Sequence, residues 1–310
     1  MTQDTGGSAT RPGDGPISNT GMLTALIAVS TWGLAGVVAK EITMGGVALG
    51  VYRFGIYGLG MTAVGWFTGA RISWQALRHS MWGGIALAVD IALFFTAIKL
   101  TTVVNATIVT ALQPVVVGVV AARMFGENIS KRDVRFGAVA IVGVVVVALG
   151  STGRPEWNLS GDLAAIGALL AWSAYFVANR LAQEKDVTAR QYTLCTALYT
   201  SGLNIPVALL FGQSLAFPGR TDLWWLLGLA FGAGVLGHEM MNWSLRRIPM
   251  WLGSTFTLVV PVVASAAAWV FLDEPLNAVQ IAAMAVVLAS LGAIIAGQTK
   301  TMNKKRPLRP

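Results

Sequence analysis

Residues 104–124 read VNATIVTALQPVVVGVVAARM, and residues 250–272 read MWLGSTFTLVVPVVASAAAWVFL. Each block is apolar on all sides and has the length that a helix needs to cross a bilayer, roughly twenty residues. Eight further blocks of this kind fill most of the chain: 21–39, 46–67, 81–98, 134–150, 161–181, 189–211, 223–243 and 277–297. The sequence therefore predicts an all-α integral membrane protein with ten transmembrane helices.

Composition supports this prediction. Fifty-five per cent of the 310 residues are apolar and 12% are charged, whereas about a quarter of the residues in soluble domains are charged. A soluble fold of this chain would lack the polar residues to cover its surface. Residues 1–20 are polar and rich in Gly, Ser and Pro, without the features of a cleavable signal peptide, and we expect a disordered cytoplasmic tail there.

The basic residues predict the orientation. If the amino terminus is cytoplasmic and the ten helices alternate, seventeen Lys and Arg residues fall on the cytoplasmic side and five on the other. Cytoplasmic loops of membrane proteins carry this excess. We therefore expect both termini in the cytoplasm and interpret 298–310 as a basic tail that anchors the topology. The net charge of +8 then needs no nucleic-acid partner.

The two halves of the chain match one another. Trp32 recurs as Trp172, 140 residues later, and after a seven-residue shift Pro114 recurs as Pro261 and Glu127 as Glu274. We interpret 21–150 and 161–297 as two five-helix repeats. Because five is an odd number, the second repeat must enter the membrane from the opposite side. Inverted repeats of this kind are common in secondary transporters, which hold substrate between the repeats near mid-membrane.

These features resemble a known family. Two five-helix halves, Trp32-Gly33 and Trp172-Ser173 in the opening helices, and a Pro followed by a Glu in each fourth helix resemble the drug/metabolite transporter superfamily. More narrowly, they resemble its EamA-type ten-helix members, including bacterial exporters of aromatic amino acids. The resemblance covers about 21–297. It implies an inner-membrane exporter of amino acids or related metabolites, with no ATP hydrolysis and no prosthetic group.

Several polar residues fall inside the apolar blocks, where a charge is costly unless it has a partner or faces a water-filled cavity. Asp90 lies in the third block, and His238, Glu239 and Asn242 lie in the eighth. The second repeat follows the first by 147 residues in this region, so Asp90 matches position 237, one residue from His238. Both repeats therefore carry ionisable groups at nearly the same depth. We expect them to line a cavity between the repeats. The structural alternative is a hydrogen-bond network that ties helices together.

Protonation of Asp90 or Glu239 would remove the charge that makes such burial costly. Proton coupling through either carboxyl group is therefore a hypothesis. No metal site is expected, because His79 lies in a loop and His238 has no second histidine nearby.

Aromatic and amide residues complete the predicted cavity. Aromatic rings can stack a flat apolar substrate, and amides can orient its amino and carboxyl groups. The candidate aromatic residues are Trp32, Phe94, Trp172, Tyr175 and Trp243, and the candidate amides are Asn105, Gln113, Asn179 and Asn242. Tyr52 and Tyr192 fall near helix ends, and we interpret them as interfacial residues of the aromatic belt.

Pro114 and Pro261 fall in the middle of the two quoted blocks. Each proline removes a backbone hydrogen bond and kinks its helix. Matched breaks in two repeats point to the binding site and the moving parts of a transporter. We expect both prolines to act in gating; a kink that serves packing alone is the alternative.

The sequence thus predicts a secondary transporter that exports small metabolites, amino acids above all, by alternating access. Its expected partners are a small-molecule substrate, the lipid bilayer and protons as a candidate coupling ion. Sugars, nucleotide sugars or cationic drugs are alternative substrates. An intramembrane hydrolase is the alternative of another class, but no catalytic residues, cofactor or nucleophile motif are evident. A membrane scaffold would leave the buried ionisable groups unexplained.

Overall fold

The structure is a computed structural model that describes residues 17–68, 72–101, 103–150 and 158–305. Of the expected tails, 1–16 and 306–310 lie outside the described residues. Within the described part of the chain every regular element is a helix, so the all-α prediction is confirmed there. The elements in chain order are α1 (Asn19–Lys40), α2 (Gly46–Thr68), α3 (Trp74–Leu100), α4 (Val103–Thr110), α5 (Gln113–Phe125), α6 (Lys131–Gly150), α7 (Leu159–Gln183), α8 (Ala189–Leu210), α9 (Arg220–Leu229), the π-helix η1 (Ala230–Glu239), α10 (Met240–Ser244), α11 (Met250–Phe256), α12 (Val259–Phe271) and α13 (Ala278–Lys305).

Nine helical segments of the described chain are long and apolar enough to cross a membrane, with α4–α5 and α11–α12 each counted as one segment. Their outward side chains are those of a lipid-facing surface: Phe67 is 87% exposed and Leu210 is 83% exposed. Exposed apolar area on this scale is expected where lipid tails rather than water surround the helices. The remaining predicted block forms the consecutive helices α9, η1 and α10.

Several helices extend beyond the predicted blocks because polar residues cap them. The third helix begins at Trp74 rather than 81, and the Ser73 hydroxyl accepts a hydrogen bond from the Ala76 amide at 3.0 Å. The first helix begins at Asn19, inside the expected tail, with Ser18 as its cap. Ser is a favoured N-cap because its oxygen accepts a first-turn N–H. The tail predicted from 298 is helical through Lys305, and Gln298 donates to Asp133 at 2.8 Å.

The two predicted blocks that contain a central proline, 104–124 and 250–272, are each broken one turn before that proline. Pro114 and Pro261 lie in the first turns of α5 and α12 and have no N–H to give to the carbonyl groups of Thr110 and Thr257, four residues earlier. The Thr257 carbonyl accepts instead from the Val260 amide at 3.0 Å. Two turn residues separate α4 from α5 and α11 from α12. The two breaks meet across the molecule, because the Thr257 hydroxyl donates to the Gln113 side chain at 2.9 Å.

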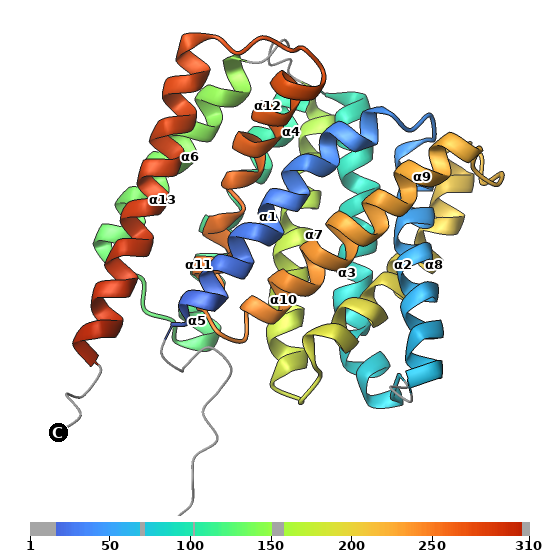
Figure 1. The fold of residues 1–310 in the computed structure, drawn as a ribbon, viewed down its shortest axis with the longest axis horizontal. Coiled ribbons are helices and arrows are strands. Elements are labelled where there is room, and N and C mark those ends of the chain that lie inside the picture. The colour runs from blue at the N-terminus through green and yellow to red at the C-terminus, as the bar shows by residue number, and fades with distance from the viewer. Residues whose placement is uncertain (1–16, 69–71, 102, 151–157, 306–310) are drawn as a thin grey trace, which may run out of the picture.

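The two halves of the chain pack closely against each other. Helix α3 runs along α7, α2 runs along α8, and α1 packs against both α12 and η1. Figure 1 shows α1 and the α9–α10 segment as neighbouring diagonal helices, with α6 and α13 paired at one edge. Gly237 of η1 allows the close approach to α1, because a Cβ atom there would overlap the Trp32 indole. The middle of the molecule is therefore walled by helices from both halves.

Candidate functional site

A cavity of about 620 Å³ lies between the two halves. Its walls come from α1, α2, α3, α4–α5, α6, α7, η1 and α11–α12. Most of the lining is apolar, but Arg53, Asp90, Gln113 and His238 also face it. A mostly apolar cavity with a few convergent polar groups is the usual form of a small-molecule site.

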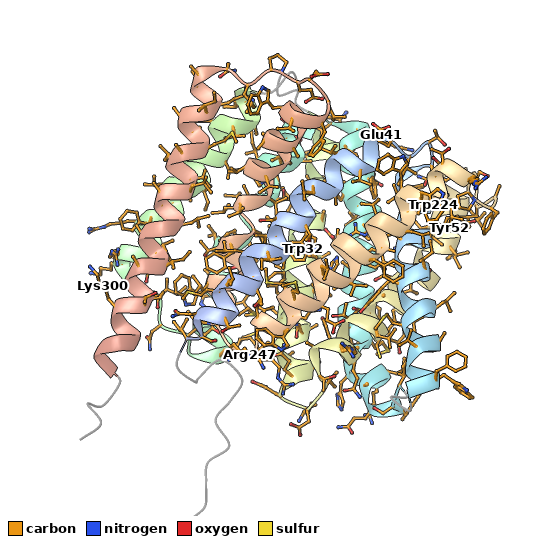
Figure 2. All side chains as sticks on the ribbon, in the orientation of Figure 1. Trp32, Glu41, Tyr52, Trp224, Arg247 and Lys300 are labelled. Atoms are coloured by element: carbon orange, nitrogen blue, oxygen red, sulfur yellow. The ribbon has the colours of Figure 1, made fainter. Side chains whose placement is uncertain are left out.

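Aromatic rings surround His238 at the inner wall of this cavity. The His238 ring centroid lies 5.1 Å from that of Trp32, 5.5 Å from Phe54 and 6.0 Å from Trp172. The matched residues Trp32 and Trp172 contact each other edge-on at 5.2 Å. Figure 2 shows Trp32 near the middle of the molecule, between Glu41 at one end and Arg247 at the other. The rings thus form an aromatic wall at mid-height, against which a flat apolar group can pack.

Two hydrogen-bond donors on the cavity wall have no partner among the described residues. Gln113 is 1% exposed, and its Nε2 has no hydrogen-bond partner among the described residues; the same is true of the buried Arg53 Nε. Buried donors are normally satisfied, because an unsatisfied one costs about 1–3 kcal/mol. Asp90, on the facing helix α3, adds a carboxylate to the same cavity.

The structure brings seven of the predicted residues to one cavity: Trp32, Asp90, Phe94, Gln113, Trp172, His238 and Pro261. The predicted equivalence of Asp90 and position 237 agrees with this arrangement, because Asp90 and His238 face the same space. Pro114 does not line it. Asn105 does not line it either, because its amide donates to Asp162 at 3.0 Å and to Thr101 at 2.9 Å, tying α4 to the first turn of α7.

Tyr175, Asn179 and Asn242 form a buried polar layer instead of the cavity wall. The Asn242 Nδ2 donates to the Tyr175 hydroxyl and to Thr193 Oγ1, both at 2.8 Å. Asn179 donates to Asn242, and Gln183 donates to the Asn242 carbonyl at 2.9 Å. All of these side chains are at most 3% exposed. These three residues therefore do not line the central cavity. They belong to a hydrogen-bond network that ties helices together, which was the structural alternative.

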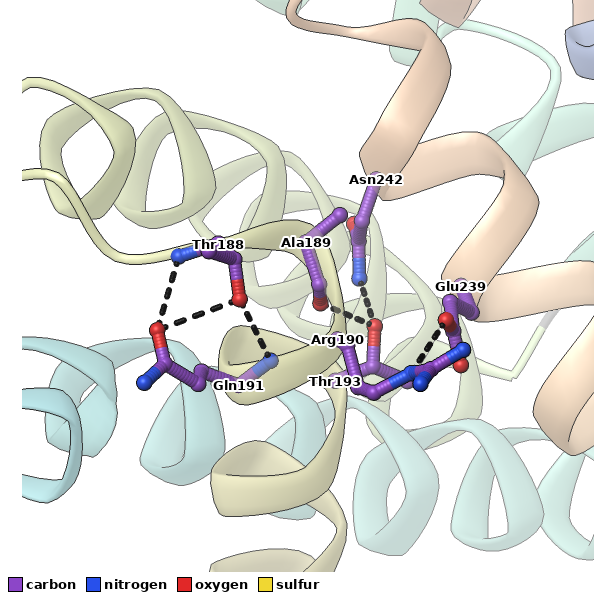
Figure 3. Close-up of polar contacts among 7 residues, drawn as sticks. All are labelled: Thr188, Ala189, Arg190, Gln191, Thr193, Glu239 and Asn242. Atoms are coloured by element: carbon purple, nitrogen blue, oxygen red, sulfur yellow. Dashed lines mark hydrogen bonds and ion pairs between the residues drawn. The ribbon is translucent and has the colours of Figure 1, made fainter. Parts of the chain in front are cut away.

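Glu239 and Trp243 lie beyond the polar layer. They line a second pocket near the start of α8, where Glu239 Oε1 accepts from Arg190 Nε at 3.0 Å. Figure 3 shows this contact beside the Asn242–Thr193 hydrogen bond. Consecutive residues of η1 therefore face different spaces: His238 faces the central cavity and Glu239 faces the second pocket.

Sequence reasoning missed Arg53. The topology count placed Arg53 on the outer side, within the predicted block 46–67, and it was not among the candidate site residues. It lies two turns inside α2 and faces the cavity. The signal was present, because a charge inside an apolar block indicates a functional site just as Asp90 does. Tyr192 is also corrected: it is fully buried and donates to the Tyr175 carbonyl at 2.8 Å, so it does not belong to an interfacial belt.

Among the described residues, the lining of the cavity extends toward one end of the bundle. Its lining extends from the aromatic wall to Val37 near the end of α1 and to the exposed Glu274 beyond α12. At the other end the polar layer and the buried Arg180 fill the space between α7, α8 and α10.

Comparison with known proteins assigns this architecture to a family. The sequence pattern of the EamA-like transporter family matches residues 19–149 and 159–296. The chain belongs to this family. It is therefore a multi-pass membrane protein of a transporter family.

Individual relatives agree with this assignment. The chain is 27% identical over 209 residues to a "Probable amino-acid metabolite efflux pump" of Salmonella typhimurium, which covers 64% of this chain and 70% of that protein. It is 26% identical over 234 residues to the "Aromatic amino acid exporter YddG" of Ancylobacter novellus, covering 73% of this chain and 75% of the relative. A solved crystal structure with 20% identity superposes with a TM-score of 0.77 over 91% of this chain and 98% of that one, which shows the shared fold.

Proposed function

We propose that this EamA-family protein is a secondary carrier that exports amino acids with apolar or aromatic side chains across the bacterial cytoplasmic membrane. The substrate binds in the central cavity, and the two halves of the chain expose it alternately to the two sides. The names of the relatives, amino-acid efflux pump and aromatic amino acid exporter, agree with this substrate class.

The chemistry of the cavity carries the proposal. Arg53 and Gln113 present unpaired donors, which suit a carboxylate. Asp90 presents an acceptor for an ammonium group, and the rings of Trp32 and Trp172 suit an apolar or aromatic side chain. An α-amino acid has these three groups in one small molecule. A sugar carries no charge, so it would offer no counter-charge to Arg53 or Asp90. A cationic drug would offer none to Arg53.

The proposed topology has ten spans, with α9, η1 and α10 forming the eighth, and two inverted halves, 21–150 and 161–297. Arg247 and Lys300 lie toward one end of the molecule and Glu41 toward the other (Figure 2). The excess of basic residues supports a cytoplasmic location for the end with Arg247 and Lys300. On this orientation the cavity faces outward, and the polar layer of Tyr175, Asn179 and Asn242 closes the cytoplasmic side.

Transport by the purified protein in liposomes tests the proposal. We expect saturable uptake of labelled tryptophan and phenylalanine, stimulated by a proton gradient, and weaker uptake of threonine. Trp32→Ala and Trp172→Ala should raise the half-saturation concentration for tryptophan about 10-fold or more, as loss of a stacking ring predicts. Trp82→Ala is the matched control, since Trp82 is 68% exposed on the outer face of α3.

Absence of uptake for every amino acid would reject the amino-acid proposal. Sugars, nucleotide sugars and cationic drugs would then be tested in the same liposomes. Product formation from any of these compounds without net transport would instead indicate the intramembrane enzyme.

A further inference from the structure

The second pocket lies at the opposite end of the molecule from the mouth of the central cavity. It has a volume of about 630 Å³ and is formed by the start of α8, the end of η1, α10 and the turn that follows α10. Arg190, Glu239, Trp243, Arg246 and Arg247 supply its chemistry. The polar layer around Asn242 separates it from the central cavity, so neither the aromatic wall nor Asp90 belongs to it.

The charges of this pocket are incompletely matched. Three guanidinium groups face one carboxylate, and that carboxylate is already paired with Arg190. The Arg247 guanidinium lies 3.4 Å from the centre of the Trp243 ring and donates to the Trp243 carbonyl at 3.1 Å. Burial, together with the neighbouring charge of Arg246, lowers the pKa of Arg247 from its usual value. A ligand with an acid group would relieve this unbalanced positive charge.

The carboxylate of the pocket also has an unused atom. Glu239 Oε1 accepts from Arg190 at 3.0 Å, but its buried Oε2 has no hydrogen-bond partner among the described residues. A buried carboxylate oxygen without a donor is uncommon in folded proteins. It favours a ligand that brings a donor group, such as an ammonium, in addition to its acid group.

We propose that this pocket is a second substrate site, which takes the acid and amine groups of the exported amino acid on the cytoplasmic side before the polar layer opens. This inference rests on the proposed function. The acid group would bind Arg246 and Arg247, the amine would bind Glu239, and the Trp243 ring would cover the apolar side chain. The central cavity offers the same three kinds of group in Arg53, Asp90 and Trp32, so one class of molecule fits both sides of the layer.

The alternative occupant is the phosphate group of an anionic lipid. Guanidinium groups and an indole at a membrane surface suit a lipid headgroup as well. A lipid phosphate would satisfy the arginines but would leave Glu239 Oε2 without its donor. The amino acid is therefore favoured by the geometry, and lipid binding is an outcome that the experiment must separate.

Equilibrium binding of labelled phenylalanine to the purified protein in lipid nanodiscs tests the inference. We expect two molecules bound per chain in the unmodified protein. The double variant Glu239→Gln/Arg246→Gln should weaken the second-pocket site about 10-fold and leave the cavity site unchanged, whereas Trp32→Ala should weaken the cavity site about 10-fold and leave the second-pocket site unchanged. Glu184→Gln/Arg78→Gln is the matched control, because it removes the same charges from exposed positions at the same end.

A flux measurement gives the second readout. In inside-out vesicles the Glu239→Gln/Arg246→Gln variant should need about 10-fold more cytoplasmic-side phenylalanine for half-maximal transport. The half-saturation concentration for phenylalanine added on the outer side, measured by exchange of labelled for unlabelled phenylalanine, should change less than twofold. Unchanged heat unfolding and elution on size-exclusion chromatography would verify that the variant is folded.

The other outcomes overturn the inference. One bound molecule in the unmodified protein, together with normal transport, would reject the second site while the proposed function stands. Neither binding nor transport of any amino acid would reject both. A double variant that loses binding of phosphatidylglycerol but keeps two bound phenylalanine molecules would assign the pocket to a lipid headgroup.

Discussion

Arg53 is a cation inside an apolar span, and it faces the cavity with its Nε unpaired among the described residues. If it binds the substrate carboxylate, Arg53→Gln removes a charge-assisted hydrogen bond, worth about 1.5–3 kcal/mol. The half-saturation concentration for phenylalanine in liposome transport should then rise about 10- to 150-fold. Competition by phenethylamine, which lacks the acid group, should change little.

Arg78→Gln is the control for this substitution, because Arg78 is exposed in the first turns of α3. Equal losses for phenylalanine and phenethylamine would contradict carboxylate binding and indicate that Arg53 holds the fold of the cavity.

Asp90 is the better placed of the two carboxyl groups considered for proton coupling. It lines the cavity, whereas Glu239 lies beyond the polar layer and is paired with Arg190. Protonation would remove a charge from the middle of the membrane, which favours movement of the unloaded carrier. We expect Asp90→Asn to abolish the stimulation of transport by a pH gradient while exchange of labelled for unlabelled substrate continues.

Asp273→Asn serves as the control for Asp90→Asn, since Asp273 is exposed outside the helices and its backbone conformation is one that Asn tolerates. If Asp90→Asn and Glu239→Gln both retain full pH-driven transport, proton coupling through these groups is wrong.

At the scale of helices, the broken segment α11–α12 is the element with the clearest capacity to move. Pro261 cannot donate to the Thr257 carbonyl, which accepts from the Val260 amide instead, and both Thr257 and Pro261 line the cavity. Pro261→Ala restores an N–H and should join α11 to α12. We expect turnover in liposomes to fall several-fold while the half-saturation concentration changes less than twofold, because a stiffer helix hinders the transition more than binding.

Pro206→Ala is the matched control, because Pro206 also lies inside a helix, α8, but is exposed and remote from the cavity. Equal losses of binding and turnover for Pro261→Ala would count against a gating role.

The start of α11 depends on a carboxylate from another part of the chain. Glu127 accepts hydrogen bonds from the amides of Met250 at 2.8 Å and Trp251 at 3.1 Å, and it lies 3.9 Å from the buried Arg180. A carboxylate at a helix N-terminus is favourable because first-turn amides point toward it. Glu127→Gln should destabilise the protein by about 1.5–3 kcal/mol, since a neutral amide replaces the charged acceptor of two backbone hydrogen bonds beside a buried guanidinium.

Heat unfolding in detergent micelles would measure this effect as a lower midpoint temperature. Glu184→Gln, at an exposed position after α7, should leave the midpoint unchanged. A Glu127→Gln midpoint equal to that of the unmodified protein would show that the carboxylate charge is not needed there.

For the whole molecule, the orientation can be tested with single cysteines. The native Cys195 is fully buried, so it contributes little background. Glu41 and Lys300 are exposed at opposite ends of the bundle (Figure 2). In intact bacterial cells a membrane-impermeant maleimide should label Glu41→Cys at once and Lys300→Cys only after permeabilisation. The reverse pattern would overturn the topology and the assignment of the cavity mouth to the outside.

The sequence by itself determined the features that depend on local composition. Blocks of apolar residues with the length of a bilayer span require helices, because no other backbone structure within one segment satisfies its own hydrogen bonds in lipid. The breaks before Pro114 and Pro261 agree with the backbone donor that each proline removes, although α8 continues through Pro206. Trp32, Asp90, Trp172 and His238 were all predicted as cavity residues from their types and their positions in the apolar blocks, and all four line the central cavity.

Tertiary structure alone decided which helix faces meet. A helix that is apolar on all sides carries no amphipathic signal to say which residues turn inward. Asn105 and Asn242 look alike in sequence, yet one binds Asp162 at the edge of α7 and the other lies in the polar layer. Arg53 faces the cavity because α2 packs on α8 and η1. The division of His238 and Glu239 between two spaces likewise follows from packing around η1, which no local pattern encodes.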